Sequence, residues 1–572
     1  MVYGMALYKK TINGNVYWYL REMARVDGKP KMVSERYLGS AKDIEKLLDA
    51  KESATVPEKT RHLGFGDCAA VWGILQRLNI TGIIDDVVGP RRADAGASVG
   101  TYLSLAALNR VVAPTSKAGF GDWWKTTAAD RFTKIPASVL DHRRFWDAMH
   151  KVTLEQLARI EEAIALAMIT EFNLDISALA LDMTNFATYI DSANENAPIA
   201  QRGKAKQKRN DLRLVGLGLV ITRDGGIPLL AHAYPGNKPD VTQFPLMIDA
   251  LGKRHRKLAD TAGIPGNPEV TVVFDAGQNS ASNFARVTDT DLAFVGSIPP
   301  SQVTDLLTIP AKERAIVDKT RFGGLSAIET RRIVYGTERR VILTHSPTLH
   351  QKQVAGFAQT LAKAQAKLSD LADTLERGKT RRTTAELTAH IASITRDPWL
   401  QRVLACEVTG TTPATHRLSV GINEKARTEL EDEVFGKRNL VTTHENWPIA
   451  EVVEAYRSQS DAEFGFRQLK DPHVVSFSPM NHWTEHNIRI HTFTCVLALQ
   501  IAHLMRREAE QAGEHHSVRE LLERLGSIGE TVMIYPSTGG RPKARRMLTE
   551  EIDTHATLAG IFDLNRWAPK KS

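Results

Sequence analysis

Hydrophobic and polar residues alternate along the first 40 positions, and this pattern predicts a small sheet. Two such runs, residues 3–11 and 16–23, flank Asn13-Gly14, which is the dipeptide most typical of a tight hairpin turn. A second turn at Asp27-Gly28 precedes a third run at residues 32–38. We therefore expect residues 1–45 to form a small basic β-unit.

Helical spacing of apolar residues begins after this unit. It is clearest at residues 69–78, 99–112 and 154–169, so we predict a helical region over residues 46–172. The same spacing returns at residues 447–508. An apolar run there, residues 492–505, is interrupted by Gln500 and His503, which favours a buried helix over a membrane span.

Five short apolar runs between residues 174 and 300 predict strands, with helical patterns between them. Two of these runs end in a carboxylate, Asp182 and Asp275. Alternation of strands and helices is typical of an α/β layer, here with a mixed sheet. The predicted strands occupy residues 176–182, 214–222, 227–234, 270–275 and 292–297.

The pattern over residues 328–440 predicts an insertion domain. A hairpin is predicted at residues 331–344, and a long helix at 349–375 carries Leu361, Leu368 and Leu375 at heptad spacing. A second helix at 385–394 and two strands near 402–408 and 418–422 complete it. We place core segments on either side, at residues 173–327 and 441–510, and a small mixed C-terminal segment at residues 511–572.

The net charge and its distribution indicate which class of partner the chain binds. The 572 residues carry a net charge of +8, and three basic runs lie in predicted loops at residues 201–213, 377–382 and 541–546. Basic surfaces favour nucleic acid, because each phosphate contact releases condensed counterions, although each run also fits a solvated loop. The three cysteines are far apart, which argues against zinc modules and disulfides and fits a reducing cytosol. No signal peptide is expected at the N-terminus.

A third acid joins the two strand-end carboxylates. Tyr456, Glu463 and Lys470 are seven residues apart each time, and Arg467 lies one turn beyond Glu463, so a single helix would present all four on one face. Two divalent ions held by carboxylates can activate a nucleophile and stabilise a leaving oxygen in phosphodiester chemistry. Mg²⁺ prefers oxygen ligands, and the two cations and the phenol can hold a phosphate. Taken singly, an Asp after a strand is more often a turn former, and a Glu/Lys pair on a helix is usually solvated.

The combination resembles the DDE transposases of bacterial insertion sequences, in the IS-four superfamily. The family pattern of Tyr, two residues, Arg, three residues, Glu, six residues and Lys is matched at Tyr456, Glu463 and Lys470, with Gln459 where Arg is usual. Further matching blocks are LDMTNF at 181–186, the GN-x-x-D end at 236–240, FDAG at 274–277, and HWTE with IRIH at 482–491. The resemblance covers almost the whole chain.

This resemblance implies an RNase H-like catalytic core interrupted by the insertion domain, and it implies that the helical region at residues 46–172 binds DNA ends. It implies metal binding and catalysis by Asp182, Asp275 and Glu463 with two Mg²⁺ or Mn²⁺ ions, and DNA contacts by Tyr456, Arg467 and Lys470. The expected partners are double-stranded DNA, at element ends and target, and further copies of the chain in a dimeric or higher synaptic complex, without a membrane. The expected location is the bacterial cytoplasm, at the nucleoid when bound to DNA.

Two other functions remain open at this point. One is a DNA-binding regulator derived from a transposase, which the presence of all three acids and Lys470 disfavours. The other is an RNase H-like nuclease without strand transfer, which would have little need for the helical region and the insertion. Asp175 and Asp191 flank Asp182 and are weaker candidates for the first metal ligand.

Overall fold

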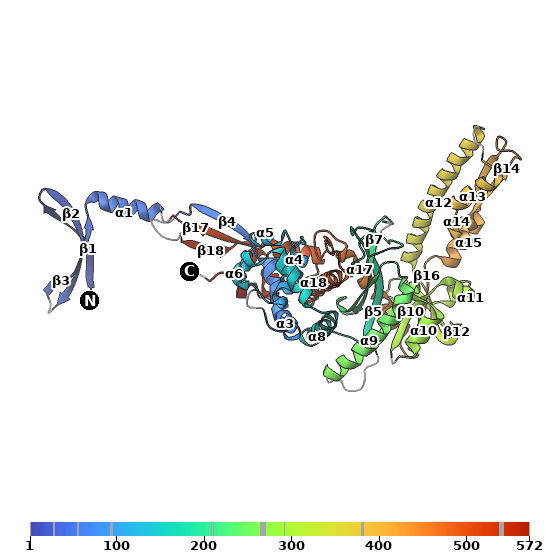
Figure 1. The fold of residues 1–572 in the computed structure, drawn as a ribbon, viewed down its shortest axis with the longest axis horizontal. Coiled ribbons are helices and arrows are strands. Elements are labelled where there is room, and N and C mark those ends of the chain that lie inside the picture. The colour runs from blue at the N-terminus through green and yellow to red at the C-terminus, as the bar shows by residue number, and fades with distance from the viewer. Residues whose placement is uncertain are drawn as a thin grey trace. The chain divides into compact units, whose positions relative to one another are not determined.

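The structure, a computed structural model, describes every residue except 1, 27–28, 54–55, 92–94, 207–208, 210, 263–269, 291, 379–381, 537–542 and 571–572. The chain forms two compact units (Figure 1): Met1–Ile74, Lys117–His142 and Glu508–Ser572 make the first, and Leu75–Ser116 with Arg143–Arg507 make the second. The expected helical region at residues 46–172 is therefore shared between the two units. The expected turn at Asp27-Gly28 lies outside the described residues.

A three-stranded antiparallel sheet opens the first unit, in the order β1 (Val2–Ile12), β2 (Asn15–Val26) and β3 (Lys29–Gly39). Asn13 and Gly14 both have positive φ, 50° and 77°, as the mirror-image turns of hairpins require. The predicted hairpin and third strand are thus confirmed. Helix α1 (Ala41–Ser53) follows directly.

The first unit contains a second sheet that the sequence did not predict. Strand β4 (Lys59–Gly64) pairs with β17 (Gly529–Ile534), which pairs with β18 (Ala544–Leu548). A helical assignment of residues 46–172 is wrong at β4, because its mostly polar KTRHLG sequence acquires a ladder only from a segment near the other end of the chain. Buried Glu530 on β17 binds Arg131 and Arg546, each at 2.6 Å.

A ten-stranded mixed sheet forms the second unit's centre. Its order is β11-β12-β13-β16-β10-β9-β5-β7, and β6 and β8 both pair with β7. Strands β5, β9 and β10 are parallel neighbours, and the other pairings are antiparallel. All five strands predicted between residues 174 and 300 are present. The strands are β5 (Ala178–Thr188), β6 (Gln201–Arg202), β7 (Arg213–Thr222), β8 (Pro228–Pro235), β9 (Thr271–Phe274), β10 (Ala293–Ile298), β11 (Ala315–Ile316), β12 (Ser326–Val334), β13 (Thr337–His345) and β16 (Lys437–Thr442).

The expected bounds of the insertion, residues 328–440, need correction. The hairpin predicted within this range consists of β12 and β13, and both strands belong to the large sheet. Strand β16, at the C-terminal end of the range, belongs to the same sheet. The physical reason is burial: Val341, Ile342 and Leu343 of β13 are fully buried and require cover on both faces of the strand. Of the described residues in this range, those between β13 and β16 form a separate segment outside the sheet.

That segment, which we call the lobe (residues 347–434), packs around its own hydrophobic core. Leu361, Leu368 and Leu375 on α12 are buried, as the heptad spacing predicted, and Leu368 packs with Phe357 and Leu430. The lobe contains α12 (Pro347–Glu376), α13 (Thr384–Ile394), α14 (Pro398–Val403), α15 (Glu424–Val434) and the hairpin β14 (Leu404–Thr409) and β15 (Arg417–Ile422).

Helices cover both faces of the large sheet. On one face α9 (Asp240–Ala262) packs Phe244 against Phe274 of β9, with ring centroids 5.0 Å apart. On the other lie α16 (Ile449–Arg457), α17 (Gln459–Leu469) and α18 (Glu485–Gln511). Among the described helices, only α18 is long and apolar enough to cross a membrane, and 94% of its most apolar window is buried inside the protein, as expected for a core helix.

Further helices complete the two units. They are α2 (Gly66–Arg77), α3 (Ile80–Val88), α4 (Val99–Val112), α5 (Phe120–Trp124), α6 (Ala129–Thr133), α7 (His142–Lys151), α8 (Leu154–Phe172), α10 (Ala281–Thr288), α11 (Thr304–Leu307), α19 (Val518–Ser527), α20 (Glu551–Thr554) and α21 (Ala556–Ile561).

The lobe core predicts the effect of a cavity mutation. Leu368→Ala should destabilise the protein by about 2–5 kcal/mol, because it removes a fully buried side chain and leaves a void. Urea unfolding, followed by fluorescence and by limited proteolysis of the lobe, measures the change. Lys367→Ala, at the exposed neighbouring position, should change stability by no more than about 0.5 kcal/mol. Equal stability of the two variants would contradict the described packing.

Candidate active site

Strands β5 and β9 bring the first two predicted acids together. Their parallel register runs from Ala178 opposite Thr271 to Ala180 opposite Val273, and Asp182 and Asp275 each lie two residues beyond the last pair. Neighbouring strands are about 4.8 Å apart, so these positions stand side by side. Asp275 directly follows β9, as predicted. Asp182 does not end its strand, because β5 continues to Thr188 along its ladder with β7.

Both acids point to the same face of the sheet. Side chains alternate along a strand, and the residues next to the acids, Met183 and Phe274, lie on the α9 face. Phe274 contacts Phe244 of α9 there, and Met183 lies close to Met247 across Gly218. Asp182 and Asp275 therefore face the side that α16 and α17 cover.

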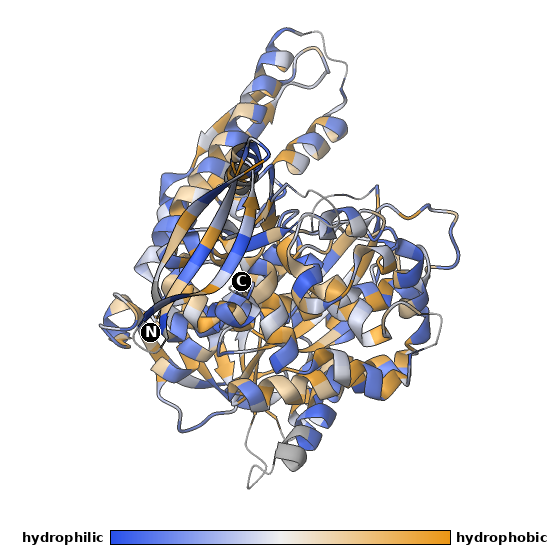
Figure 2. Ribbon diagram, turned by 90° about the vertical axis from the view of Figure 1, so that its left-hand side faces the viewer, coloured by the Kyte–Doolittle hydropathy of each residue, from blue (hydrophilic) through white to orange (hydrophobic). Residues whose placement is uncertain are grey.

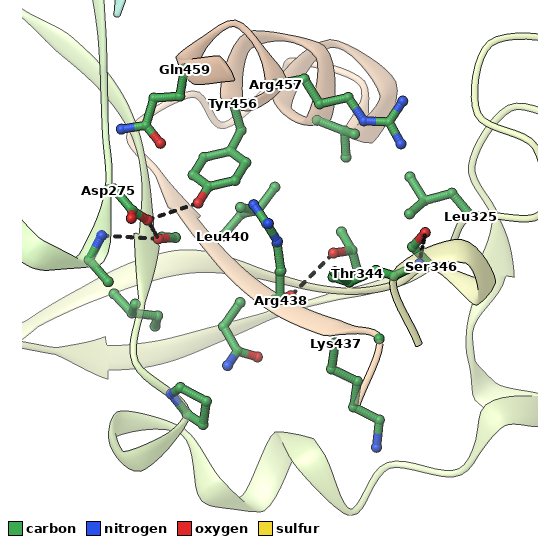
Figure 3. Close-up of a pocket in the computed structure, with 18 of the residues that line it drawn as sticks. Asp275, Leu325, Thr344, Ser346, Lys437, Arg438, Leu440, Tyr456, Arg457 and Gln459 are labelled. Atoms are coloured by element: carbon green, nitrogen blue, oxygen red, sulfur yellow. Dashed lines mark hydrogen bonds between the residues drawn. The ribbon is translucent and has the colours of Figure 1, made fainter. Parts of the chain in front are cut away.

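Two hydroxyl groups hold Asp275. Tyr456 on α16 and Ser297 on β10 both donate to Asp275 Oδ1, at 2.9 and 2.7 Å. Figure 3 shows the Tyr456 ring reaching down from its helix to this carboxylate, with Gln459 beside it. Burial and the charge of Asp275 raise the pKa of Tyr456 to about 12. At neutral pH the phenol is therefore a proton donor that fixes the orientation of the Asp275 carboxylate.

Glu463 lies on a different helix from Tyr456. The sequence predicted that one helix carries all four residues on one face, but the helix is interrupted at Ser458, which lies between α16 and α17. The Ser458 hydroxyl donates to the Ala455 carbonyl oxygen at 2.6 Å, a local bond that competes with helix continuation. Glu463 is exposed and still lines the same cavity as Asp275 and Tyr456.

This cavity has a volume of about 580 Å³ and combines both signs of charge. Asp275 and Glu463 supply its carboxylates, and Lys437, Arg438 and Arg457 supply its cations. Figure 3 shows Arg438 rising into the cavity from β16, below Tyr456 and Arg457. Its guanidinium lies 5.5 Å from the centre of the Tyr456 ring. Sequence reasoning missed Arg438, because a basic pair at the start of a short strand carries no signal for a site until the strand is placed in the sheet.

Asp182 sits beside this cavity in a more enclosed setting. Burial raises the pKa of Asp182 to about 6, the Met183 amide and Lys206 oppose the rise, and the negative charges of Glu463 and Asp240 add to it. The Met183 amide donates to Asp182 Oδ1 at 2.7 Å. Since Glu463 acts on the Asp182 carboxyl through space, the two acids are electrostatically coupled.

Lys470 contacts Thr184, the next residue of β5 after Asp182 whose side chain lies on the same face of the sheet. Its ammonium donates to Thr184 Oγ1 at 2.7 Å and lies 5.5 Å from the centre of the Phe186 ring. Burial and the nearby Lys206 charge lower the pKa of Lys470, while Asp182 raises it. The Thr of the D-x-T segment thus positions the lysine of the Glu helix, a role that the sequence did not suggest.

A fourth acid, Asp240, was not among the predicted ligands. It accepts a hydrogen bond from Tyr234 Oη at 2.8 Å and pairs with Lys206 at 3.0 Å. Burial, followed by the charge of Asp240, raises the pKa of Tyr234. The Tyr234 ring lies across Gly216, where a Cβ would come within 2.2 Å of it. The signal for Asp240 was its place at the end of the GN-x-x-D block.

Other predicted residues lie away from this cluster. Arg467 is exposed, lies over the Phe464 ring at 5.8 Å, and is not among the residues that line the cavity. Arg213, in the first basic run, is buried and donates to four backbone carbonyl oxygens, so it organises a loop. Asp175 and Asp191 accept backbone amides two residues on, as turn formers do. Residues 207–208, 210, 379–381 and 541–542 of the three basic runs lie outside the described residues.

The donor chemistry suits a hard divalent ion, but the three carboxylates do not form a closed cluster. Among the described residues, no three Asp, Glu, His or Cys side chains lie close enough together to hold one metal ion as a group. Carboxylate oxygens are nevertheless the ligands that Mg²⁺ and Mn²⁺ prefer, and three of them face this region from β5, β9 and α17.

Comparisons with known proteins show a distant similarity in fold. No family model matches the chain, and a search of curated proteins finds no match in sequence. The fold is similar to that of piggyBac transposase in a cryo-EM structure of its synaptic complex with hairpin DNA. The TM-score is 0.36, with 8% sequence identity over 88% of this chain and 82% of that chain. At this level of similarity, conclusions about function depend on the site itself.

Proposed function

We propose that this chain is a DDE transposase, which cleaves DNA strands at the ends of a mobile element and joins them to target DNA. One observation carries the proposal. Asp182 and Asp275 occupy matching positions on two parallel strands and face the side from which Tyr456, Glu463 and Lys470 approach. The strand order β8-β7-β5-β9-β10, with β5, β9 and β10 parallel, is compatible with an RNase H-like core.

Asp182, Asp275 and Glu463 are the residues that would hold two divalent ions, Mg²⁺ or Mn²⁺. When bound, such ions lower the pKa of the attacking water or hydroxyl and stabilise the leaving oxygen. The protein's own contribution is positioning. Tyr456 and Ser297 fix the Asp275 carboxylate, and Thr184 fixes the Lys470 ammonium beside Asp182.

The cations of the cavity suit a phosphodiester substrate. Arg438 and Arg457 line the cavity and can donate to non-bridging phosphate oxygens. Lys470, which lies outside the lining but close to Asp182, can hold the phosphate next to the acids. We propose double-stranded DNA as the substrate class, because its negative charge is opposite to the net positive charge of the chain. Synapsis of two element ends would need at least two copies of the chain. A simple nuclease would cleave without joining the freed 3′-OH, so a strand-transfer assay separates these activities.

Glu463→Gln tests the proposal directly. The substitution retains size and hydrogen bonding but removes the charge that holds a divalent ion, so it should abolish Mg²⁺-dependent nicking. Binding of the same DNA in a gel-shift assay should change little, because affinity comes from cations spread over the surface. Asp373→Asn, at an exposed position of α12, is the matched control and should nick at the wild-type rate. Nicking by Glu463→Gln at that rate would exclude Glu463 as a metal ligand.

The two supporting residues should show graded effects in the same assay. Lys470→Ala removes the cation beside the acids and should slow nicking by roughly 10²-fold, in the range seen when one transition-state donor is lost. Tyr456→Phe removes one hydrogen bond to Asp275, worth about 1 kcal/mol, and should slow nicking only about fivefold. A larger loss with Tyr456→Phe than with Lys470→Ala would contradict the assigned roles.

The raised pKa of Asp182 predicts a pH-dependent effect on stability. In the unfolded chain an Asp titrates near ~3.9, whereas the folded pKa is about 6, so stability is lost as pH rises through this window. In EDTA, Asp182→Asn should therefore raise the melting temperature relative to wild type at about pH 8, and the gain should vanish by about pH 4.

Divalent ions should reverse the order of the melting temperatures of wild type and Asp182→Asn. Mg²⁺ binds the folded protein and should raise the melting temperature of wild type at about pH 8, but much less that of Asp182→Asn. Asp373→Asn should follow wild type in both buffers. A variant Asp182→Asn that melts at or below wild type without metal would show that the Asp182 carboxyl is not strained by burial and neighbouring charge.

A further inference from the structure

Half of the chain's net positive charge lies in its first sheet. Residues 1–39 contain seven Lys or Arg residues and three Asp or Glu residues, which is a surplus of four charges in a chain whose total is +8. A surplus of this density in so short a segment is typical of a surface that contacts nucleic-acid phosphates. The catalytic cluster in the second unit uses none of these residues.

One face of the sheet gathers four tyrosines and two cations. Residues opposite each other in neighbouring antiparallel strands project to the same face. Tyr8, Tyr19 and Tyr37 form one such row, and Lys10 lies opposite Tyr17 in the next. With Arg21 they make up a surface that we call the tyrosine–cation face: Tyr8, Lys10, Tyr17, Tyr19, Arg21 and Tyr37.

The side chains of this face already contact each other. The Arg21 guanidinium lies 3.6 Å from the centre of the Tyr8 ring, and the Lys10 ammonium lies 4.6 Å from that of Tyr19. Glu35, which pairs with Arg21 at 2.8 Å and Lys10 at 3.3 Å, holds both cations in place. Tyr8 and Tyr37 remain 43% and 56% exposed. The face is thus ordered yet open to solvent.

The opposite face of the same sheet has a different composition. Leu7, Leu20 and Arg36 form one row there, and Lys9 lies opposite Trp18. Figure 2 shows hydrophilic and hydrophobic residues alternating along the strands near the N-terminus. Lys9 and Arg36 are both exposed cations that lie away from the tyrosine cluster. They provide a matched control for charge.

We propose that the tyrosine–cation face binds double-stranded DNA, as an anchoring surface separate from the catalytic cavity. Cations and phenolic hydroxyls both donate to phosphate oxygens, and antiparallel strands fit the major groove of a duplex. Single-stranded DNA would instead need flat rings free to stack with bases. Tyr19 and Tyr37 are tilted at 58° against each other, and cations occupy the faces of Tyr8 and Tyr19, which favours the duplex.

This inference rests on the proposed function only for DNA as the partner, and binding in EDTA tests it without any cleavage. Full-length Lys10→Ala/Arg21→Ala is compared with Lys9→Ala/Arg36→Ala, which removes the same charge from the opposite face. The probes are a duplex of mixed sequence and a single strand of equal length, titrated by fluorescence anisotropy at several salt concentrations. Circular dichroism confirms that each variant is folded.

The tyrosine–cation variant should bind the duplex about tenfold more weakly. Its salt slope should fall by about 2, one unit for each phosphate that no longer has a cation beside it. The control pair should remain within about twofold of wild type in affinity. Tyr8→Phe/Tyr37→Phe, which keeps both rings, should weaken duplex binding by a few-fold through loss of the hydroxyls.

Three results would overturn the proposal. They are equal losses for the two charge pairs, wild-type binding by the tyrosine–cation variant, and tighter binding of the single strand than of the duplex. None of these outcomes bears on Mg²⁺-dependent nicking, which depends on Glu463. The two proposals can also fail separately. If the wild-type protein does not nick DNA but Lys10→Ala/Arg21→Ala still weakens duplex binding, the transposase activity is refuted and the DNA-binding face is retained.

Discussion

Burial of the Asp182 carboxyl near the charges of Glu463 and Asp240 is the constraint on which the site in the second unit depends. The parallel pairing of β5 and β9 fixes Asp182 and Asp275 at matching positions, so neither acid can leave the site by a small backbone shift. Each acid is accommodated differently. Asp275 receives two hydroxyl donors, whereas Asp182 has a pKa raised to about 6 and is flanked by Lys206 and Lys470. Such opposed settings are typical of sites that bind cations or move protons.

The orientation of the Glu463 helix depends on a buried histidine of α18. His503 contacts the Gly226 carbonyl oxygen at 2.7 Å and the Gln468 side chain at 2.8 Å, so one ring joins the β7–β8 turn to α17. Burial and the Arg506 charge lower the pKa of His503 to about 3, and the ring is neutral at ordinary pH. A neutral ring can link two elements in the core without adding charge near the carboxylates.

The sequence predicted the features that have a local signature. Asn13-Gly14 determined the first hairpin, and continuous apolar runs determined the five strands between residues 174 and 300, because turn chemistry and burial act within a few residues. The positions of Asp182, Asp275 and Glu463 on one face of the sheet could be anticipated from strands and spacing. Features set by distant pairing could not: β4 obtains its partner from β17, and β12, β13 and β16 join the sheet through one another. Arg438 and the Thr184–Lys470 contact arise only when those strands assemble.

Both ends of the lobe are attached to the sheet at one pair of opposite residues. His345, which ends β13, is paired directly with Lys437, which begins β16. Because the two attachment points are neighbours, the sheet needs no particular length or shape of chain between them, only that it return to where it started. The lobe is therefore a modular attachment: natural selection can lengthen, trim or exchange it while the strands that carry the acids keep their register. New surface contacts can evolve there without moving the strands that carry Asp182 and Asp275.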